Sequence, residues 1–229
     1  MSGAAGGTDP CARQVRDPAV ALGDAVRATA AAMTALSTVT GGVFRERDLE
    51  RVLVVALGEV TRPFLVSTGH RVDFVEWQPR VGPVDVVLKA KGSAPHAFIE
   101  LKWGARTLYN CIWDAAKMAA AIAACHVERA FLVAGAPAAE FEVGHGREFL
   151  GDGSWHALAD CFQAGYIPYW KKWWHEVKTR PQSLPAEFET GVVAAEAMTI
   201  AGDPWVLRAS EVRVTGASWT AVPASAKDL

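Results

Sequence analysis

Two apolar runs, GPVDVVL and HAFIELKW, lie close together in the chain and restrict its fold more than any other feature. They are separated by a short polar stretch that contains Gly92-Ser93. Gly at the first central position suits a two-residue type II′ turn, so the runs predict a β-hairpin. In the register that follows, Val86 lies opposite Ile99 and Leu88 lies opposite Ala97. Apolar residues then face each other along one side of the hairpin, and a slip by one residue would destroy this match.

The other side of the same hairpin carries charge. Alternation along the strands places Asp85 opposite Glu100, with Lys102 on the same side two residues further on. Two carboxylates that face each other repel, so one of them takes a proton or a cation lies between them. Asp, Glu and backbone carbonyl oxygens are ligands that Mg²⁺ and Mn²⁺ prefer. With a lysine beside them to stabilise charge on a phosphate, these groups are suited to phosphodiester hydrolysis.

The segments around the hairpin predict an α/β core. An Ala-rich segment from Asp17 to about Ser37 begins with Asp as N-cap and Pro at the first helical position, which predicts a helix. Residues 44–60 have apolar residues at helical spacing. The remaining predicted elements are three strands, a helix and a final buried strand: Val72–Trp77, Val84–Leu88, Ala97–Trp103, a helix from Thr107 to about Cys125, and residues 129–135.

The chain after Pro137 gives weaker signals. WHALADCF and IPYWKKWWHEVK predict helices, and residues 191–214 predict a hairpin that turns at Gly202-Asp203-Pro204. Basic residues alternate with aromatic ones in the second of these segments. Lys171, Lys172 and Trp173 are therefore candidates for phosphate contact and base stacking. The alternative is that the tryptophans are core or interface anchors with solvated lysines between them.

The hairpin resembles the metal site of the PD-(D/E)XK, or restriction-endonuclease-like, nuclease superfamily. The matching residues are Asp85 in GPVDVVL and Glu100-Leu101-Lys102 in AFIELKW, and the order of elements agrees over residues 44–135. The chain departs from the pattern in that its proline precedes Asp85 by two positions rather than one. The resemblance implies a mixed sheet flanked by helices. It also implies that Asp85, Glu100 and the Leu101 carbonyl bind the metal while Lys102 orients the attacking water.

Members of this superfamily often add an acid from the first core helix. RERDLERVL is similar to that element, and the resemblance assigns Glu46 to the metal, with Glu50 as the substitute. It also makes Lys117, on the predicted 107–125 helix, a candidate contact for nucleic acid. The other interpretation of Lys117 is an ordinary i,i+3 pair with Asp114 on a solvated face that also carries Asn110.

The composition limits the possible partners and the compartment. The net charge of −2 gives no global basic field, so a polyanion must be held by a local patch or by metal ions. The four cysteines form no CxxC pair, which is typical of buried thiols in a reducing compartment. No signal peptide is visible, and the apolar run MAAAIAAC is too short to span a bilayer. We therefore expect a cytoplasmic protein without a membrane partner.

Two functions follow from these observations. The first is a Mg²⁺- or Mn²⁺-dependent nuclease, an endonuclease that hydrolyses phosphodiester bonds of nucleic acid, with DNA as the favoured substrate. The second is an inactive module of the same fold that binds a protein partner or a second copy of the chain through its Trp-rich part. For either function, we expect three regions. These are an N-terminal helical extension (1–40), the nuclease-like core (41–136), and a C-terminal α+β accessory region packed on the core (137–229).

Overall fold

The fold is described from a computed structural model of the chain. It describes residues 17–61, 65–71, 77–78, 83–89, 93–106, 108, 111–143, 150, 154–157, 180–181, 183–185, 187–216 and 218–221. The predicted positions Lys171, Lys172 and Trp173 lie outside these residues, as do Thr107, Asn110 and the 167–178 segment as a whole.

Two helices begin the described chain. Helix α1 spans Pro18–Thr40, and the Asp17 carboxylate caps it by accepting the backbone N–H of Ala19 at 2.7 Å. Helix α2 spans Glu46–Val60 and buries Leu49, Leu53 and Leu57 on one face. Both helices are therefore confirmed, with α1 extending three residues beyond the predicted end.

Helix α1, and not the segment around MAAAIAAC, has the length and composition of a membrane-spanning segment. An 18-residue window within α1 reaches a mean hydropathy of 1.2. In the structure α1 packs on strand β9 (Glu187–Ile200) and on α2, with Leu22 and Val26 fully buried. One face of α1 is therefore buried against the sheet and α2.

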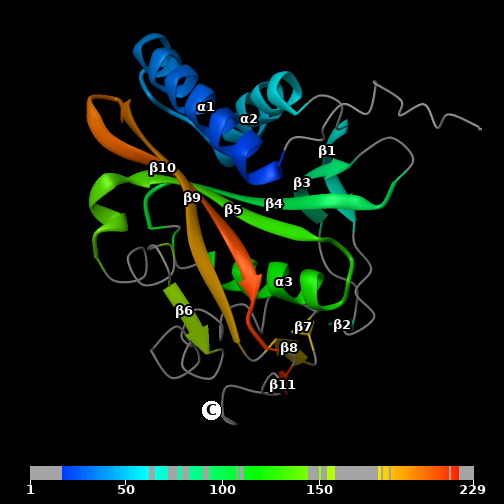
Figure 1. The fold of residues 1–229 in the computed structure, drawn as a ribbon. Helices are drawn as coiled ribbons and strands as arrows, with labels where there is room; N and C mark the ends of the chain where they lie inside the picture. Colours follow the sequence, from blue (N-terminus) through cyan, green and yellow to red (C-terminus); the bar gives the residue numbers. More distant parts are fainter. Residues whose placement is uncertain are drawn as a thin grey trace, which may run out of the picture.

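A seven-stranded mixed sheet forms the centre of the molecule (Figure 1). Its order is β1-β3-β4-β5-β10-β9-β6, and the strands beside β9 are β1 (Leu65–Arg71), β3 (Pro83–Lys89), β4 (Pro95–Trp103), β5 (Arg129–Pro137), β10 (Asp203–Val214) and β6 (Ser154–Ala157). Two small two-stranded sheets lie apart from it: β2 (Trp77–Gln78) with β7 (Arg180–Pro181), and β8 (Ser183–Pro185) with β11 (Trp219–Ala221).

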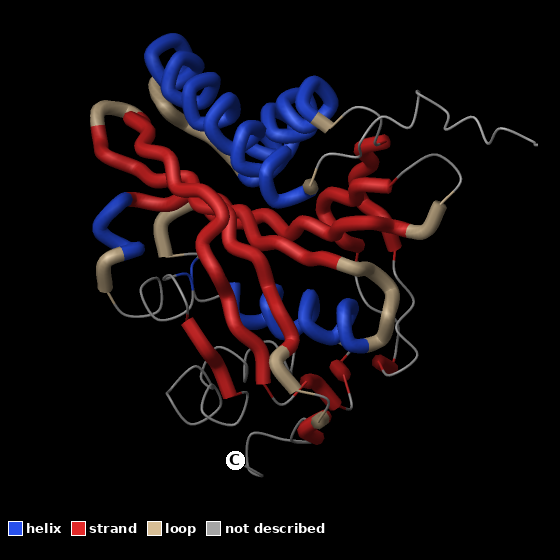
Figure 2. Tube along the Cα trace, viewed as in Figure 1, coloured by secondary structure: helices blue, strands red, loops and turns tan. Residues whose placement is uncertain are grey.

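One parallel pair, β4 with β5, interrupts an otherwise antiparallel sheet. A parallel pair needs a crossover connection, and helix α3 (Cys111–Ala123) provides it. A 3₁₀ turn, η2 (Ala138–Phe141), follows β5. Helices α1 and α2 cover one face of the sheet and α3 covers the other (Figure 2). The predicted α/β class, with a mixed central sheet flanked by helices, is thus confirmed.

The hairpin register is confirmed over three consecutive pairs. Val86 pairs with Ile99, Val87 with Phe98 and Leu88 with Ala97. The register then shifts at Lys89, which pairs with Pro95. The predicted turn residue Gly92 lies outside the described part of the chain. Pro95 has no N–H to donate to the ladder, which accounts for an irregularity at this end.

Other predictions need correction. The first strand of the sheet is β1, which precedes the predicted Val72–Trp77; residues 72–76 lie outside the described part of the chain. The sequence LVSTGHR contains few apolar residues, so the hydrophobic pattern does not predict this edge strand. Residues 155–157, predicted as the start of a helix, belong to strand β6. The C-terminal hairpin is confirmed as β9 and β10, and it turns at Ala201-Gly202.

Candidate carboxylate–lysine active site

Four carboxylates and two lysines meet beside the end of strand β4. They come from four elements: Glu46 (α2), Asp85 (β3), Glu100 and Lys102 (β4), and Asp114 and Lys117 (α3). The crossover from β4 to β5 lays α3 against the face of β4 that carries the charged side chains. This topology places the acids and lysines together.

Glu100 and Lys117 form the most buried pair of the site. The Lys117 ammonium contacts Glu100 Oε1, and the two residues are only 3% and 7% exposed. Burial raises the pKa of Glu100 to about 8; Lys117 opposes this rise, and the nearby Asp114 and Asp85 carboxylates add to it. The pair is therefore shielded from water and lies close to two further carboxylates.

Lys102 is held by oxygen atoms from three elements. Its Nζ lies 3.0 Å from Asp114 Oδ2 and 3.9 Å from Glu46 Oε2, and it donates to the Leu101 carbonyl at 2.7 Å. Burial alone would lower the pKa of Lys102, but Asp114, Glu46 and Glu100 outweigh burial and raise it well above the usual range. These carboxylates favour the ammonium form of Lys102, so the residue is suited to the role of a fixed cation rather than to that of a base.

Asp85 uses its carboxylate to bridge the hairpin strands. Its Oδ2 accepts the backbone N–H of Leu101 at 2.8 Å, just beyond the last backbone pair, Val86 with Ile99. The side chain therefore replaces a ladder hydrogen bond at the point where the two strands separate. This bond fixes Asp85 next to the Glu100–Lys102 segment.

Glu46 reaches the site from the first position of helix α2. Its side chain is 45% exposed, so it borders the solvent. Partial burial raises the pKa of Glu46; Lys102 counteracts this, and Asp85 and Asp114 reinforce it. An acid in the first turn also suits the positive end of the helix dipole. Of the two glutamates considered from the sequence, Glu46 lies beside Lys102, and no described contact joins Glu50 to the cluster.

The interpretation of Asp114 and Lys117 as a solvated surface pair is wrong. Asp114 is 4% exposed, and its two oxygens lie near Lys102 and Lys117. A signal is present in the sequence: these are the only charged residues in CIWDAAKMAAAIA. A helix with so little charge has no polar side to turn toward water, so its charged residues must be paired inside the protein.

The donor set fits a hard divalent cation by its chemistry. Carboxylates outnumber ammonium groups four to two, and the surplus negative charge adds to the raised pKa of Glu100. In the part of the chain that the structure describes, however, no three His, Cys, Asp or Glu side chains converge closely enough to form a ready-made metal site. Lys102 and Lys117 lie among the carboxylates instead.

Comparisons with known proteins add no family: no family model, no curated protein and no solved structure matches the chain.

Proposed function

We propose that this protein is a metal-dependent nuclease that hydrolyses phosphodiester bonds, with DNA as its substrate. The observation that carries the proposal is the convergence of Asp85, Glu100, Lys102 and Glu46 at one end of strand β4. The order of the elements supports it. Three antiparallel strands, a crossover helix and a parallel fourth strand are the arrangement expected of the PD-(D/E)XK superfamily.

The ligands proposed for Mg²⁺ or Mn²⁺ are the carboxylates of Asp85, Glu100 and Glu46 and the carbonyl of Leu101. When bound, such an ion supplies an activated water and stabilises charge on the phosphate. The Leu101 carbonyl accepts a hydrogen bond from Lys102 Nζ, so the lysine lies next to the proposed ligands.

The protein's own residues have distinct parts in this proposal. Lys102, held protonated by Asp114 and Glu46, offers a fixed positive charge to the phosphate and orients the water that attacks it. Asp114 is a positioning residue, because it contacts Lys102 and not the reacting atoms. When no metal ion is bound, Lys117 neutralises the negative charge of the Glu100 carboxylate.

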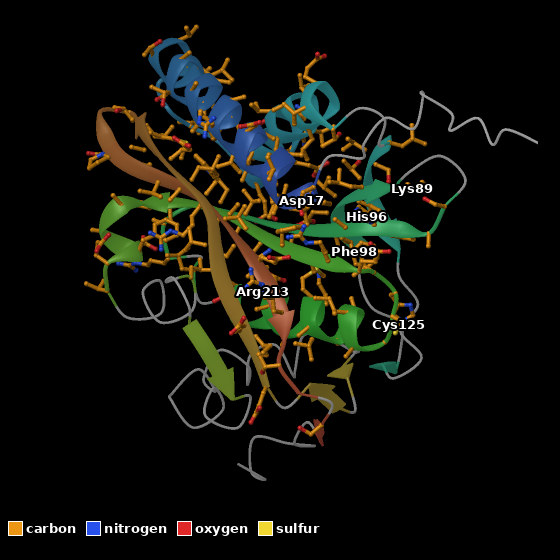
Figure 3. All side chains as sticks on the ribbon, viewed as in Figure 1. Asp17, Lys89, His96, Phe98, Cys125 and Arg213 are labelled. Atoms are coloured by element: carbon orange, nitrogen blue, oxygen red, sulfur yellow. The ribbon has the colours of Figure 1, made fainter. Side chains whose placement is uncertain are left out.

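Cleavage assays test this function directly. Supercoiled plasmid and single-stranded DNA are incubated with Mg²⁺ or Mn²⁺ and either wild-type protein or the Asp85→Ala, Glu100→Ala and Lys102→Ala variants. Lys89→Ala is the matched control, because Lys89 lies on β3 at the far end of the hairpin (Figure 3). We expect cleavage by wild type and the control alone. Equal cleavage by all four variants would overturn the assignment.

One observation favours a second function, a binding or assembly module without catalysis. The Glu100–Lys117 and Lys102–Asp114 pairs partly neutralise the site without any bound ion. Titration of Mn²⁺ by calorimetry separates the two functions. Saturable binding that is lost in Glu100→Ala favours the nuclease, and no binding together with a stable oligomer favours the module.

A further inference from the structure

A short loop follows strand β4 at the open side of the carboxylate–lysine site. Strand β4 ends at Trp103, whose backbone hydrogen-bonds to the Glu46 carboxylate. Since Glu46 borders the solvent, a ligand can enter the site at this end of β4. Residues 104–106 form the loop, so the Cα atom of Arg106 lies within about 14 Å of that of Lys102, four residues earlier in the chain.

Arg106 has a backbone conformation that arginine rarely adopts. Its φ is 61°, in the left-handed region that favours glycine. Both carboxylate oxygens of Glu140, on η2, accept the backbone N–H of Arg106, at 2.9 and 2.8 Å. At the start of the loop, the Gly104 N–H donates to the Gly135 carbonyl at 3.0 Å. The loop conformation is therefore fixed by β5 and by the turn that follows it.

The strain at Arg106 indicates a role for its side chain. Glycine adopts this conformation at little cost, whereas a Cβ atom makes it unfavourable. Strained residues that their neighbours hold in place are concentrated at ligand sites. Arg106 is exposed, so a ligand can reach its guanidinium from the solvent.

The loop also lies at the end of the sheet where a ligand is expected. Strands β4 and β5 are the parallel pair; the loop follows the carboxyl end of β4, and Glu140 follows that of β5. In open α/β sheets, ligands bind outside the carboxyl ends of parallel strands.

A nucleic acid needs positive charge at this end of the sheet. The four carboxylates of the site repel a phosphate backbone, and the ammonium groups of Lys102 and Lys117 contact those carboxylates. The net charge of −2 provides no general attraction. A cation outside the carboxylate cluster is therefore required, and Arg106 is an exposed cation beside it.

We propose that Arg106 binds a backbone phosphate of the nucleic acid next to the phosphate that is cleaved, and that Glu140 positions it. This inference rests on the proposed nuclease function. A guanidinium donates through a fork of N–H groups that matches two phosphate oxygens. Glu140 is a positioning residue, because it contacts the Arg106 backbone and not the substrate.

The first test measures binding without turnover. In a Glu100→Gln background, which removes a proposed metal ligand's charge and keeps its shape, the affinity for a fluorescent DNA duplex is measured by anisotropy in Mg²⁺ over a range of NaCl concentrations. Adding Arg106→Gln should reduce the slope of log affinity against log salt by about 0.9, the loss of one phosphate contact. Arg106→Lys should keep the slope and lower the affinity, since it retains the charge and loses the fork.

Arg106→Gly separates the side chain from the backbone strain. Glycine adopts a positive φ freely, so this variant should melt at the same temperature as its parent or higher, measured by circular dichroism. Its salt slope should nevertheless fall as in Arg106→Gln. A lower melting temperature would contradict the strain from which the role of Arg106 is inferred.

The positioning role of Glu140 predicts an effect opposite in sign to that of its charge. Removing a negative charge near DNA strengthens binding by itself. The matched control Glu142→Ala, which removes an exposed acid two residues away, should therefore bind DNA as well as its parent or better. Glu140→Ala should instead weaken binding several-fold, and adding it to Arg106→Gln should weaken binding no further, since Glu140 acts through Arg106. Stronger binding by Glu140→Ala would contradict the positioning role.

Arg27→Gln is the control for the loss of a positive charge. Arg27 lies on α1, on the opposite face of the sheet, and pairs with Asp24 at 3.1 Å, so this variant should leave the slope unchanged. In the otherwise wild-type enzyme, Arg106→Gln should raise KM several-fold and leave kcat within about twofold, as expected for a group that binds substrate away from the reacting bond.

The outcomes separate the two proposals. If the Glu100→Gln protein binds DNA with a clear salt dependence and neither Arg106→Gln nor Arg106→Gly changes the slope, the Arg106 assignment is wrong and the nuclease proposal stands. If no variant binds DNA at any salt concentration, both are wrong.

Discussion

The ammonium group of Lys117 contacts the carboxylate of Glu100, and both side chains are buried between α3 and β4. The positive charge that the sequence requires beside Glu100 is therefore supplied by the chain itself in this structure. A metal ion that uses Glu100 as a ligand has to displace or share this contact.

Metal affinity should rise when Lys117 is removed. In Lys117→Met the competing charge is gone, and at a few ångströms the repulsion between an ammonium and a divalent ion amounts to several kcal/mol even at a high effective dielectric constant. We expect Mg²⁺ to bind at least about tenfold more tightly, measured by calorimetry at about pH 9, where wild-type Glu100 is ionised. Lys117→Arg keeps the charge and should bind Mg²⁺ like wild type. Weaker binding by Lys117→Met would show that Lys117 supports the metal instead.

Lys102 should be essential for rate but not for the pH profile. Lys102→Met should lower kcat by about 10²–10³-fold, the usual effect of removing a donor that stabilises developing charge. Because its neighbours raise the pKa of Lys102 far above the usual range, wild-type activity should show no loss through lysine titration up to about pH 10. Lys89→Met is the control and should leave kcat unchanged. A fall in rate with an apparent pKa of about 8–9 that disappears in Lys102→Arg would contradict the fixed-cation role.

The raised pKa of Glu100 predicts a pH-dependent difference in stability between the wild type and Glu100→Gln. A carboxyl group whose pKa is higher in the folded state contributes stability that is complete below its unfolded pKa, near 4.5. That contribution is lost as the pH rises through the folded value of about 8. Relative to Glu100→Gln, wild type should therefore lose stability between about pH 5 and pH 8.

Urea unfolding of both proteins at pH 5, 6, 7 and 8 in EDTA measures this difference. Adding Mn²⁺ at pH 8 should stabilise wild type more than Glu100→Gln, because only wild type offers the ionised ligand. A constant difference across this pH range would mean that Glu100 is ionised throughout it.

Gly135 should tolerate no side chain. A Cβ at this position would collide with the indole ring of Trp103, the residue that follows Lys102. Trp103 is also stacked on Trp205, with ring centres 4.9 Å apart, so the ring has little freedom to move away. Gly135→Ala should cost about 1–3 kcal/mol, measured by urea unfolding, and should reduce cleavage because it displaces the end of β4.

Gly58→Ala is the matched control for this substitution. Gly58 lies in α2, and a methyl group at this position would have no atom within 4 Å of it, so alanine should stabilise the protein by about 0.5–1 kcal/mol. If Gly135→Ala behaved like Gly58→Ala, the close approach of Trp103 would be incorrect.

The sequence predicts the part of the site that depends on local pattern. Strand alternation and the apolar match of the two hairpin arms place Asp85, Glu100 and Lys102 on one face, and helix periodicity points to Glu46. Asp114 and Lys117 are ambiguous in the sequence because i,i+3 spacing on a helix is the same for a surface pair and for a buried one. Only the packing of α3 on β4 distinguishes the two cases.

The fold is predictable where hydrophobic periodicity is strong and not where pairing is long-range. Helices α1 and α2 and the β9–β10 hairpin follow from caps, spacing and a turn. Strand β1 escapes prediction because an edge strand needs few apolar residues.

The pairing of β5 with β10 determines when the central sheet can be completed during synthesis. During synthesis, β4 and β5 leave the ribosome well before β10. The edge of β5 that pairs with β10 therefore has no hydrogen-bond partner until the chain has grown to about Val214. An early nascent chain would carry all six charged residues of the site on an unfinished sheet with an apolar, unpaired edge. Shortened versions that stop after Pro137 should therefore aggregate rather than serve as a minimal enzyme.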